Sequence, residues 1–395
     1  MAPSPSLAAN RFRTDAGWLF AAPYRPFFIG ASVLAALFVP AWAAMFISGT
    51  GEIAGMPAAA WHAHELVFGF LPAVMAGYLL AATPNWSGRL PASGRPLAAL
   101  FGVWVAGRVL PWLLPLPAAI VADAAFPLAM TAVLAREARI RSPRQSRHGL
   151  ILFPLLAAAT VAHRLVADDG DLAATLSRVG IAVAALLISA VGGRLVPSLT
   201  RNVLAGRGAE RVPEPYGRYD VLVLVALLPA LAAWVIVPAG WITAALMGGV
   251  AVLQAVRLWR WRGWSVRQTD VLALHAGYLW LVAGTALAAL AALPGAVATP
   301  ADVPPDAALH ALAAGAIGAM TMAVMARLAV TRGGGSPAAG ILCTLALAAV
   351  NLGALARVLS PFAGAQSLDL IIAGAALWTT AWTVFVVAQL LGARR

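Results

Sequence analysis

Long apolar stretches follow one another along almost the whole chain of 395 residues. A helix that spans the hydrocarbon core of a bilayer needs about 20 predominantly apolar residues, and its backbone must be hydrogen-bonded internally because no water is available there. Of the residues, 62% are hydrophobic and only 11% are charged, whereas roughly a quarter are charged in an average soluble domain. These features exclude an ordinary soluble protein and predict an all-α, polytopic membrane helix bundle.

The apolar stretches predict one integral membrane domain over residues 1–395, made of an N-terminal segment, 1–26, and a twelve-helix bundle, 27–391. Proline and glycine set several of the divisions between neighbouring helices. The predicted helices cover residues 27–48, 62–83, 97–115, 118–136, 149–167, 175–199, 220–238, 240–258, 270–293, 305–328, 338–359 and 368–391. The connections are short, so any chemistry has to take place within the bilayer or at its edge.

Arginine is distributed unevenly over the predicted connections. All 27 basic residues are arginine, and the net charge is +12. Arginine gathers at the N-terminus, in the connections near residues 89–95, 136–147, 201–218, 257–267 and 332, and at the C-terminus, whereas the alternate connections hold mostly acidic residues. Positive charge marks the cytoplasmic side of a membrane protein. The pattern therefore predicts that both termini are cytoplasmic, and it explains the basic charge without a nucleic-acid partner.

Histidines within the predicted helices are the first candidates for chemistry, because ionisable groups inside a bilayer are costly and are commonly functional. His62 and His64 lie in the motif WHAHE at the predicted outer end of 62–83, His310 lies at the outer end of 305–328, and His275 lies in the inner half of 270–293. Imidazole suits haem iron and copper. The alternative is a histidine hydrogen-bonded at the end of a helix.

The geometry of a regular helix separates the two histidines of the WHAHE motif. At 100° per residue, His62 and Glu65 share a face that continues into Gly69, while His64 points about 160° away. One regular helix would therefore not direct both histidines at a single metal. A second similarity is that His64 and His310 are each followed five residues later by a glycine, which is too little to establish an internal duplication.

Four arginines form a second set of candidates. Arg108 and Arg357 are predicted at roughly the depth of the outer histidines, and Arg194 and Arg327 near the cytoplasmic ends of their helices. Because arginine pairs bidentately with carboxylates, haem propionates are plausible partners. The cytoplasmic pair could instead extend to the membrane surface.

Few acidic residues lie deep in the predicted helices. Glu65 and Asp123 are the two that helix capping does not explain, and both are predicted near the outer face. This scarcity argues against a proton pump with carboxylates at the membrane midplane. The single cysteine, Cys343, excludes an iron–sulfur site built from this chain alone and a covalently attached haem.

Several strings over nearly the whole chain resemble the NnrS family of haem- and copper-associated membrane proteins linked to nitric oxide metabolism. They are PYRPFF, WHAHELVFGF, TPNWSGR, AGR at Arg108, VGGRLVPSLTRN, LHAGYLW and HALAAGAIGAMTMAVMAR. One departure is VTRGGG from Val330 to Gly335, where relatives read something like GHTGR, so a metal role of that histidine cannot transfer. The resemblance also implies twelve helices.

The resemblance implies a bacterial inner-membrane protein that binds haem b, one or two per chain, and possibly copper. It would act on nitric oxide in nitrosative stress and denitrification. The implied ligands are His62, His64, His275 and His310. His310 or His62 would hold a haem iron with one axial position open for a gas, and the other histidines would hold copper or a second haem.

Three functions follow from this reading. In the first, the chain is an oxidoreductase that reduces nitric oxide, with Glu65 as a proton relay and an electron donor that the sequence does not identify. The second is a transporter or exporter of a small solute or a nitrosylated metal complex, with the histidines along its path. The third is a haem-based nitric oxide sink or sensor without turnover.

Overall fold

The structure is a computed structural model, and it describes residues 17–87, 92–140, 147–295, 303–332 and 337–393. Some of the basic residues that mark the predicted cytoplasmic side lie outside these ranges, as do Gly333 to Gly335 of the VTRGGG string. Those arginines are Arg11, Arg13, Arg89, Arg141, Arg144, Arg394 and Arg395. The predicted segment 1–26 is described only from Gly17 onward.

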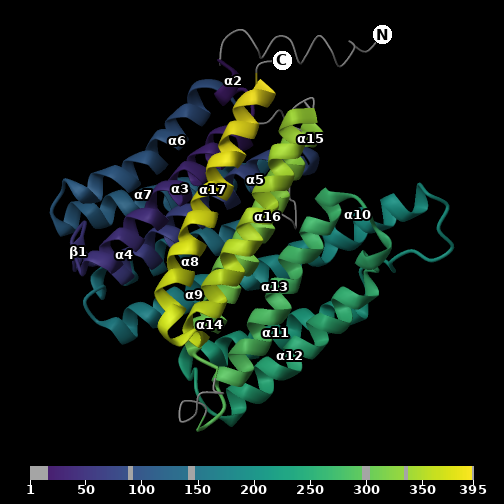
Figure 1. Ribbon diagram of the computed structural model, residues 1–395. Helices are drawn as coiled ribbons and strands as arrows, with labels where there is room; N and C mark the ends of the chain where they lie inside the picture. Colours follow the sequence, from purple (N-terminus) through teal and green to yellow (C-terminus); the bar gives the residue numbers. More distant parts are fainter. Residues whose placement is uncertain (1–16, 88–91, 141–146, 296–302, 333–336, 394–395) are drawn as a thin grey trace. The chain divides into compact units, whose positions relative to one another are not determined.

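Helices make up almost all of the described chain (Figure 1). Within the described residues, ten helices are long and apolar enough to cross a membrane, and each coincides with a predicted span. The predicted spans 97–115 and 149–167 coincide with two shorter helices, α6 (Gly94–Val109) and α8 (Arg147–Leu165). The all-α membrane fold is therefore confirmed. The count of twelve spans and the cytoplasmic termini stay predictions, as does the single domain.

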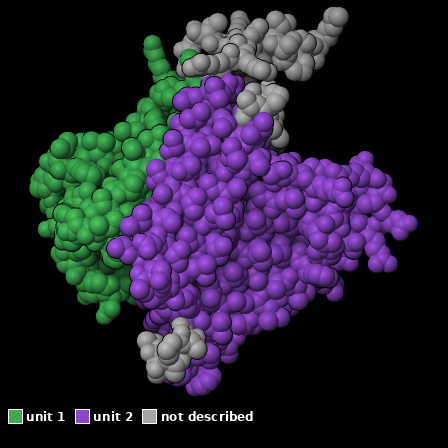
Figure 2. Space-filling view, in the orientation of Figure 1, with its two compact units in different colours: residues 1–177 green, residues 178–395 purple. Residues whose placement is uncertain are grey.

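The chain divides into two compact units, Met1–Ser177 and Arg178–Arg395, which Figure 2 colours green and purple. The first unit contains a hairpin of two very short strands between its first long helices. Its elements are α2 (Gly17–Phe20), α3 (Tyr24–Ser48), β1 (Glu52–Ile53), β2 (Met56–Pro57), α4 (Ala58–His64), η1 (Glu65–Phe70), α5 (Leu71–Ser87), α6, η2 (Leu110–Trp112), α7 (Leu116–Ile140), α8 and the start of α9 (Gly170–Leu187).

The second unit begins within α9 and contains the remaining helices. They are η3 (Ile188–Gly192), α10 (Gly193–Ala205), α11 (Arg218–Ile236), α12 (Trp241–Arg260), η4 (Gly263–Ser265), α13 (Thr269–Ala291), α14 (Pro305–His310), η5 (Ala311–Ala319), α15 (Met320–Arg332), α16 (Pro337–Leu359), η6 (Ser360–Phe362), η7 (Gly364–Gln366) and α17 (Ser367–Ala393).

Three of the helical spans contain a π-helical segment, in which hydrogen bonds run from residue i to residue i+5. These segments are η1, η3 and η5. They interrupt the second, sixth and tenth of the twelve predicted helices. Two of them begin directly after a predicted ligand, since η1 follows His64 and η5 follows His310. Because π-helical turns are frequent at functional sites, both histidines lie where a helix departs from regular geometry.

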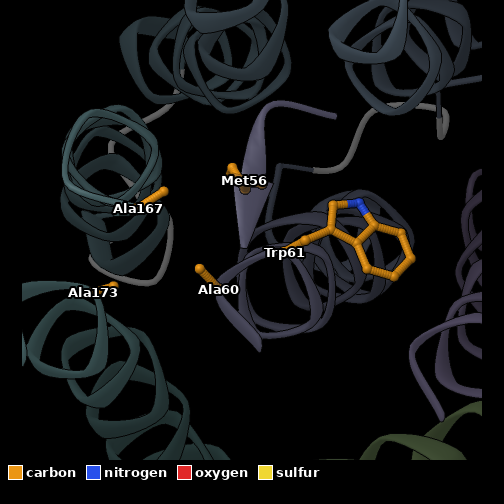
Figure 3. Close-up of a cluster of buried hydrophobic side chains, with 5 residues drawn as sticks. All are labelled: Met56, Ala60, Trp61, Ala167 and Ala173. Atoms are coloured by element: carbon orange, nitrogen blue, oxygen red, sulfur yellow. The ribbon is translucent and has the colours of Figure 1, made fainter. Parts of the chain in front are cut away.

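Small residues allow close packing within both units. In the first unit, Met56, Ala60, Ala167 and Ala173 form a buried cluster with the large ring of Trp61 (Figure 3). This cluster holds the strand hairpin and α4 against the start of α9, and it fixes the beginning of the helix that carries the WHAHE motif. In the second unit, α16 and α17 pack so closely that a methyl group on Gly353 would lie 3.1 Å from the carbonyl oxygen of Gly374, as is common for membrane helices.

Candidate functional site

A buried cluster of two carboxylates and two guanidinium groups occupies the first unit. We call Glu65, Arg108, Asp123 and Arg164 the carboxylate–arginine cluster. Nη1 of Arg108 donates to Oε2 of Glu65 at 2.8 Å, and Nη2 donates to Oδ1 of Asp123 at 2.9 Å. Nε of Arg164 binds the other oxygen of Asp123. The most exposed of the four residues, Arg108, is only 8% accessible, so the charges are balanced by one another and hardly by solvent.

Two histidines border this cluster. Nδ1 of His64 lies 3.5 Å from Oε1 of Glu65, and Nε2 lies 3.6 Å from Oδ2 of Asp123. The ring of His163 lies 5.5 Å from that of His64, centre to centre. Nε2 of His163 lies 3.1 Å from Oγ of Ser177, which itself donates to a carbonyl, so the serine accepts and Nδ1 of His163 carries the lone pair. Each nitrogen of His64 therefore faces a carboxylate that is already bound to arginine.

The structure adds a contact to the WHAHE motif that a regular helix does not predict. His64 lies beside Glu65, because adjacent side chains can both turn toward the partners that α6 and α7 supply. The ring of His62 packs on Trp42 of α3, with centres 4.5 Å apart. The expected neighbourhood of Glu65 and Gly69 is confirmed, since a methyl group on Gly69 would lie 3.0 Å from Oε2 of Glu65.

Gly69 also allows two side chains from α6 to reach the π-helical segment η1. Nε1 of Trp104 donates to the carbonyl oxygen of Gly69 at 3.0 Å. A methyl group on Gly69 would lie 2.9 Å from Nη1 of Arg108. The glycine thus leaves space for the guanidinium group, and the indole holds the backbone of the segment that follows His64.

Gly69→Ala should destabilise the protein by about 1–3 kcal/mol, because the added methyl group overpacks a well-filled site and displaces Arg108. The free energy of unfolding in detergent measures this loss. The matched control is Gly102→Ala on α6, where a methyl group would meet no atom within 4 Å and where alanine favours a helix. Equal stability of the two variants would contradict the close contact at Gly69.

The second unit contains a chain of polar contacts that ends on His310. Nδ1 of His310 lies 3.0 Å from Oδ1 of Asp306 and 2.9 Å from the backbone oxygen of the same residue. Oδ2 of Asp306 lies 2.7 Å from Nη2 of Arg357, whose Nη1 donates to Oγ of Ser360 at 3.0 Å. Both acceptors face Nδ1, so in the neutral ring of His310 that nitrogen carries the proton and Nε2 carries the lone pair.

The two glycines that follow His310 face indole rings. A methyl group on Gly315 would lie 2.5 Å from the ring of Trp280, and one on Gly318 would lie 2.7 Å from the ring of Trp378. Nε1 of Trp280 donates to Oδ1 of Asn351 at 2.9 Å, which fixes that ring in place. Side chains from α13 and α17 therefore fill the space beside both glycines.

His275 is enclosed by its neighbours in the second unit. Its Nε2 lies 2.9 Å from Oγ1 of Thr200, and this hydroxyl donates to the carbonyl oxygen of Val196. Thr200 therefore accepts from Nε2 of His275, and the lone pair lies on Nδ1. A methyl group on Gly263 would lie 2.6 Å from that Nδ1. His275 could therefore bind a metal only through Nδ1, which faces the backbone of Gly263.

The two predicted cytoplasmic arginines have different surroundings. Arg194 is exposed, and its guanidinium lies 4.5 Å from the ring centre of Tyr216. Arg327 forms an ion pair with Asp270, at the start of α13. Neither arrangement tests the predicted pairing with haem propionates.

Arg257 is buried, although its place among the basic residues of 257–267 indicated a cytoplasmic connection. Its Nε donates to Asp220 at 2.7 Å, and its Nη1 donates to the carbonyl oxygen of Ser189 in η3 at 2.8 Å and to the hydroxyl of Tyr278 at 3.0 Å. Asp220 also accepts from the backbone of Gly217, as expected for a helix cap. The side chain points back from the last turn of α12 into the unit, so its charge is balanced by Asp220.

The residues that sequence reasoning did not select are mostly partners of those it did. Arg164 and Asp306 lie in or beside predicted connections, and hydropathy alone assigned them no partner. Among the residues that the structure describes, no group of three or more His, Cys, Asp or Glu side chains could hold a metal ion. Within the described ranges, the contacts of His310 are all at Nδ1, and both ring nitrogens of His64 are buried without a hydrogen-bond partner.

The comparison with protein families matches the chain over residues 18–392 to the family described as NnrS protein. The comparisons with curated proteins and with solved structures returned no match. The matched range includes every predicted site residue and most of each unit. The chain therefore belongs to the NnrS family and is a membrane protein related to nitric oxide.

Proposed function

We propose that this chain is a haem protein of the bacterial cytoplasmic membrane that binds nitric oxide and removes it, and so protects the cell from nitrosative stress. Membership of the NnrS family supports the link to nitric oxide. The observation that carries the haem proposal is the state of His310, whose Nδ1 is committed to Asp306 while Nε2 keeps its lone pair.

The surroundings of His310 suit an axial ligand of haem iron. A ligating histidine almost always donates its other ring nitrogen to a carboxylate, a carbonyl or water, which fixes its tautomer and orientation. His310 has both a carboxylate and a carbonyl at Nδ1. Its side chain is 15% exposed, so the ring is not fully enclosed. A haem held there by His310 would supply iron that can bind the gas.

The remaining predicted ligands fit less directly. Both nitrogens of His64 face carboxylates, and those of His275 face Thr200 and Gly263. Copper and a second haem stay predictions. We therefore propose His310 as the principal ligand and the carboxylate–arginine cluster as a buried polar centre of the first unit. Glu65 can relay protons only in competition with its ion pair to Arg108.

An optical spectrum of the protein, purified after expression with ample haem, tests the proposal. We expect a Soret band, with haem bound stoichiometrically, and a change of that band when nitric oxide is added without oxygen. Metal analysis of the same sample measures iron and copper. Absence of the Soret band, together with solute flux into vesicles containing the protein, would support the transporter alternative and overturn the haem proposal.

Consumption of nitric oxide separates the enzyme from the sink. Reduction of two molecules of nitric oxide to one of nitrous oxide and one of water takes two electrons and two protons. We propose a one-electron donor protein as the source of the electrons, and a chemical reductant replaces it in the assay. Nitrous oxide produced over many turnovers would establish a reductase. A nitrosyl spectrum without nitrous oxide would establish a sink or sensor.

A further inference from the structure

The contacts around His310 form a continuous chain from one helix to another. They run from Ser360 in η6 through Arg357 at the end of α16 to Asp306 in the first turn of α14, and end on His310. We propose that Asp306, held in place by Arg357, is the positioning residue that orients His310 and strengthens it as a ligand. This inference rests on the proposed function, because it assigns a role around the same histidine.

The two carboxylate oxygens of Asp306 contact different residues. Oδ1 faces Nδ1 of His310 at 3.0 Å, and Oδ2 faces Nη2 of Arg357 at 2.7 Å. A carboxylate at Nδ1 makes the imidazole more basic, and an orienting partner of this kind commonly changes metal affinity 10- to 100-fold, as an order of magnitude. Asp306 thus links the orientation of the ring to a residue of α16.

Arg357 already has partners in the structure, so its predicted contact with a haem propionate stays a prediction. Its Nη2 is bound to Asp306 and its Nη1 to Ser360, whereas the sequence indicated a partner of a haem propionate. A propionate at Nη2 would have to displace Asp306. We infer that Arg357 anchors the positioning carboxylate.

The ion pair of Asp306 and Arg357 is suitable for mutation because it contributes little to the free energy of folding. The side chain of Asp306 is 46% exposed, and ion pairs in contact with solvent add only about 0–1 kcal/mol. The backbone oxygen of Asp306 would still accept from Nδ1 in a variant. Asp306→Asn should therefore fold and keep the tautomer, and it should lose the carboxylate alone.

Nitrogen NMR of the haem-free full chain labelled in its six histidines tests the orientation without any cofactor. The His310 signals are assigned by their loss in His310→Gln. We expect a protonated Nδ1 whose proton resonance moves upfield in Asp306→Asn, because its hydrogen bond weakens. The matched control is Asp369→Asn, since Asp369 is an exposed acid in the first turn of α17. A proton on Nε2 of His310, or an unchanged Nδ1 resonance in Asp306→Asn, would overturn the inference.

The haem-loaded protein supplies a second readout. The stretching frequency of the bond between ferrous iron and histidine should fall in Asp306→Asn, and haem affinity should drop roughly 10- to 100-fold. Asp306→Glu, which keeps the carboxylate, should retain more of both than Asp306→Asn. Suppose that the wild type binds haem through His310 and that Asp306→Asn changes neither the stretching frequency nor the haem affinity. The role of Asp306 is then overturned, while the proposed function stands. If the NMR result holds but no haem binds, the proposed function fails and the orientation of His310 by Asp306 stands.

Discussion

His310→Gln should lose most of its haem, with at least about 100-fold weaker binding. Removal of an orienting partner already costs roughly 10- to 100-fold in metal affinity, and loss of the ligand itself has to cost more. Glutamine keeps a polar side chain of similar length at the end of α14. Haem bound per protein after purification measures the effect.

Two controls separate ligation from folding. His310→Gly with added imidazole should recover haem, because the free base can occupy the place of the side chain. His163→Gln removes a buried histidine of the first unit, whose Nε2 is bound to Ser177, and should keep its haem. Full haem content in His310→Gln would show that another residue holds the haem. The candidate ligands would then be His62, His64 and His275.

Asp123→Asn should destabilise the protein by about 3–5 kcal/mol, as expected when one partner of a buried ion pair is removed. Asp123 binds both Arg108 and Arg164. Its loss leaves two buried guanidinium groups with Glu65 as the remaining carboxylate of the cluster. The free energy of unfolding in detergent measures the change.

The charge balance of the cluster provides the control for this prediction. Adding Arg164→Met to Asp123→Asn restores one carboxylate to one guanidinium, and the double variant should be more stable than Asp123→Asn alone. Asp171→Asn changes an exposed acid of the same unit and should have little effect. A double variant less stable than the single one would contradict an electrostatic origin of the loss.

The membrane fold could be predicted because the bilayer itself restricts the solutions. Every backbone polar group in the hydrocarbon core must be paired within a helix or a closed barrel, and apolar stretches of spanning length predict helices. All twelve predicted segments coincide with helices in the structure. Boundaries were less predictable, as at Ala58, where α4 begins directly after the strand hairpin.

Single site residues could also be selected, because a charged or imidazole side chain is conspicuous in an apolar helix. Their partners could not. Asp306 lies only four residues before His310, but its link to Arg357 comes from the packing of α14 against α16. Arg164 lies near the end of the predicted helix 149–167, and the fold places it on Asp123. Contacts between residues far apart in sequence leave no trace in hydropathy.

The π-helical segments could not be predicted from the sequence either, because contacts with other helices take part in forming them. The sequence contains a glycine five residues after both His64 and His310, but a glycine alone does not distinguish a π-helical turn from a regular one. In η1, the indole of Trp104 binds the backbone oxygen of Gly69, so a residue of another helix takes part in the local geometry.

By itself, the sequence determined that this chain spans a membrane as helices, which arginines mark its predicted cytoplasmic side, and which few side chains are costly enough to require a reason. Its sequence motifs also indicated the NnrS family. The tertiary structure decided which of these side chains meet. It placed His64 between carboxylates that arginines already hold, and it set Nδ1 of His310 against both the carboxylate and the backbone oxygen of Asp306. The physical reason is that a buried charge is stabilised by the partner that packing supplies, and packing depends on the whole unit.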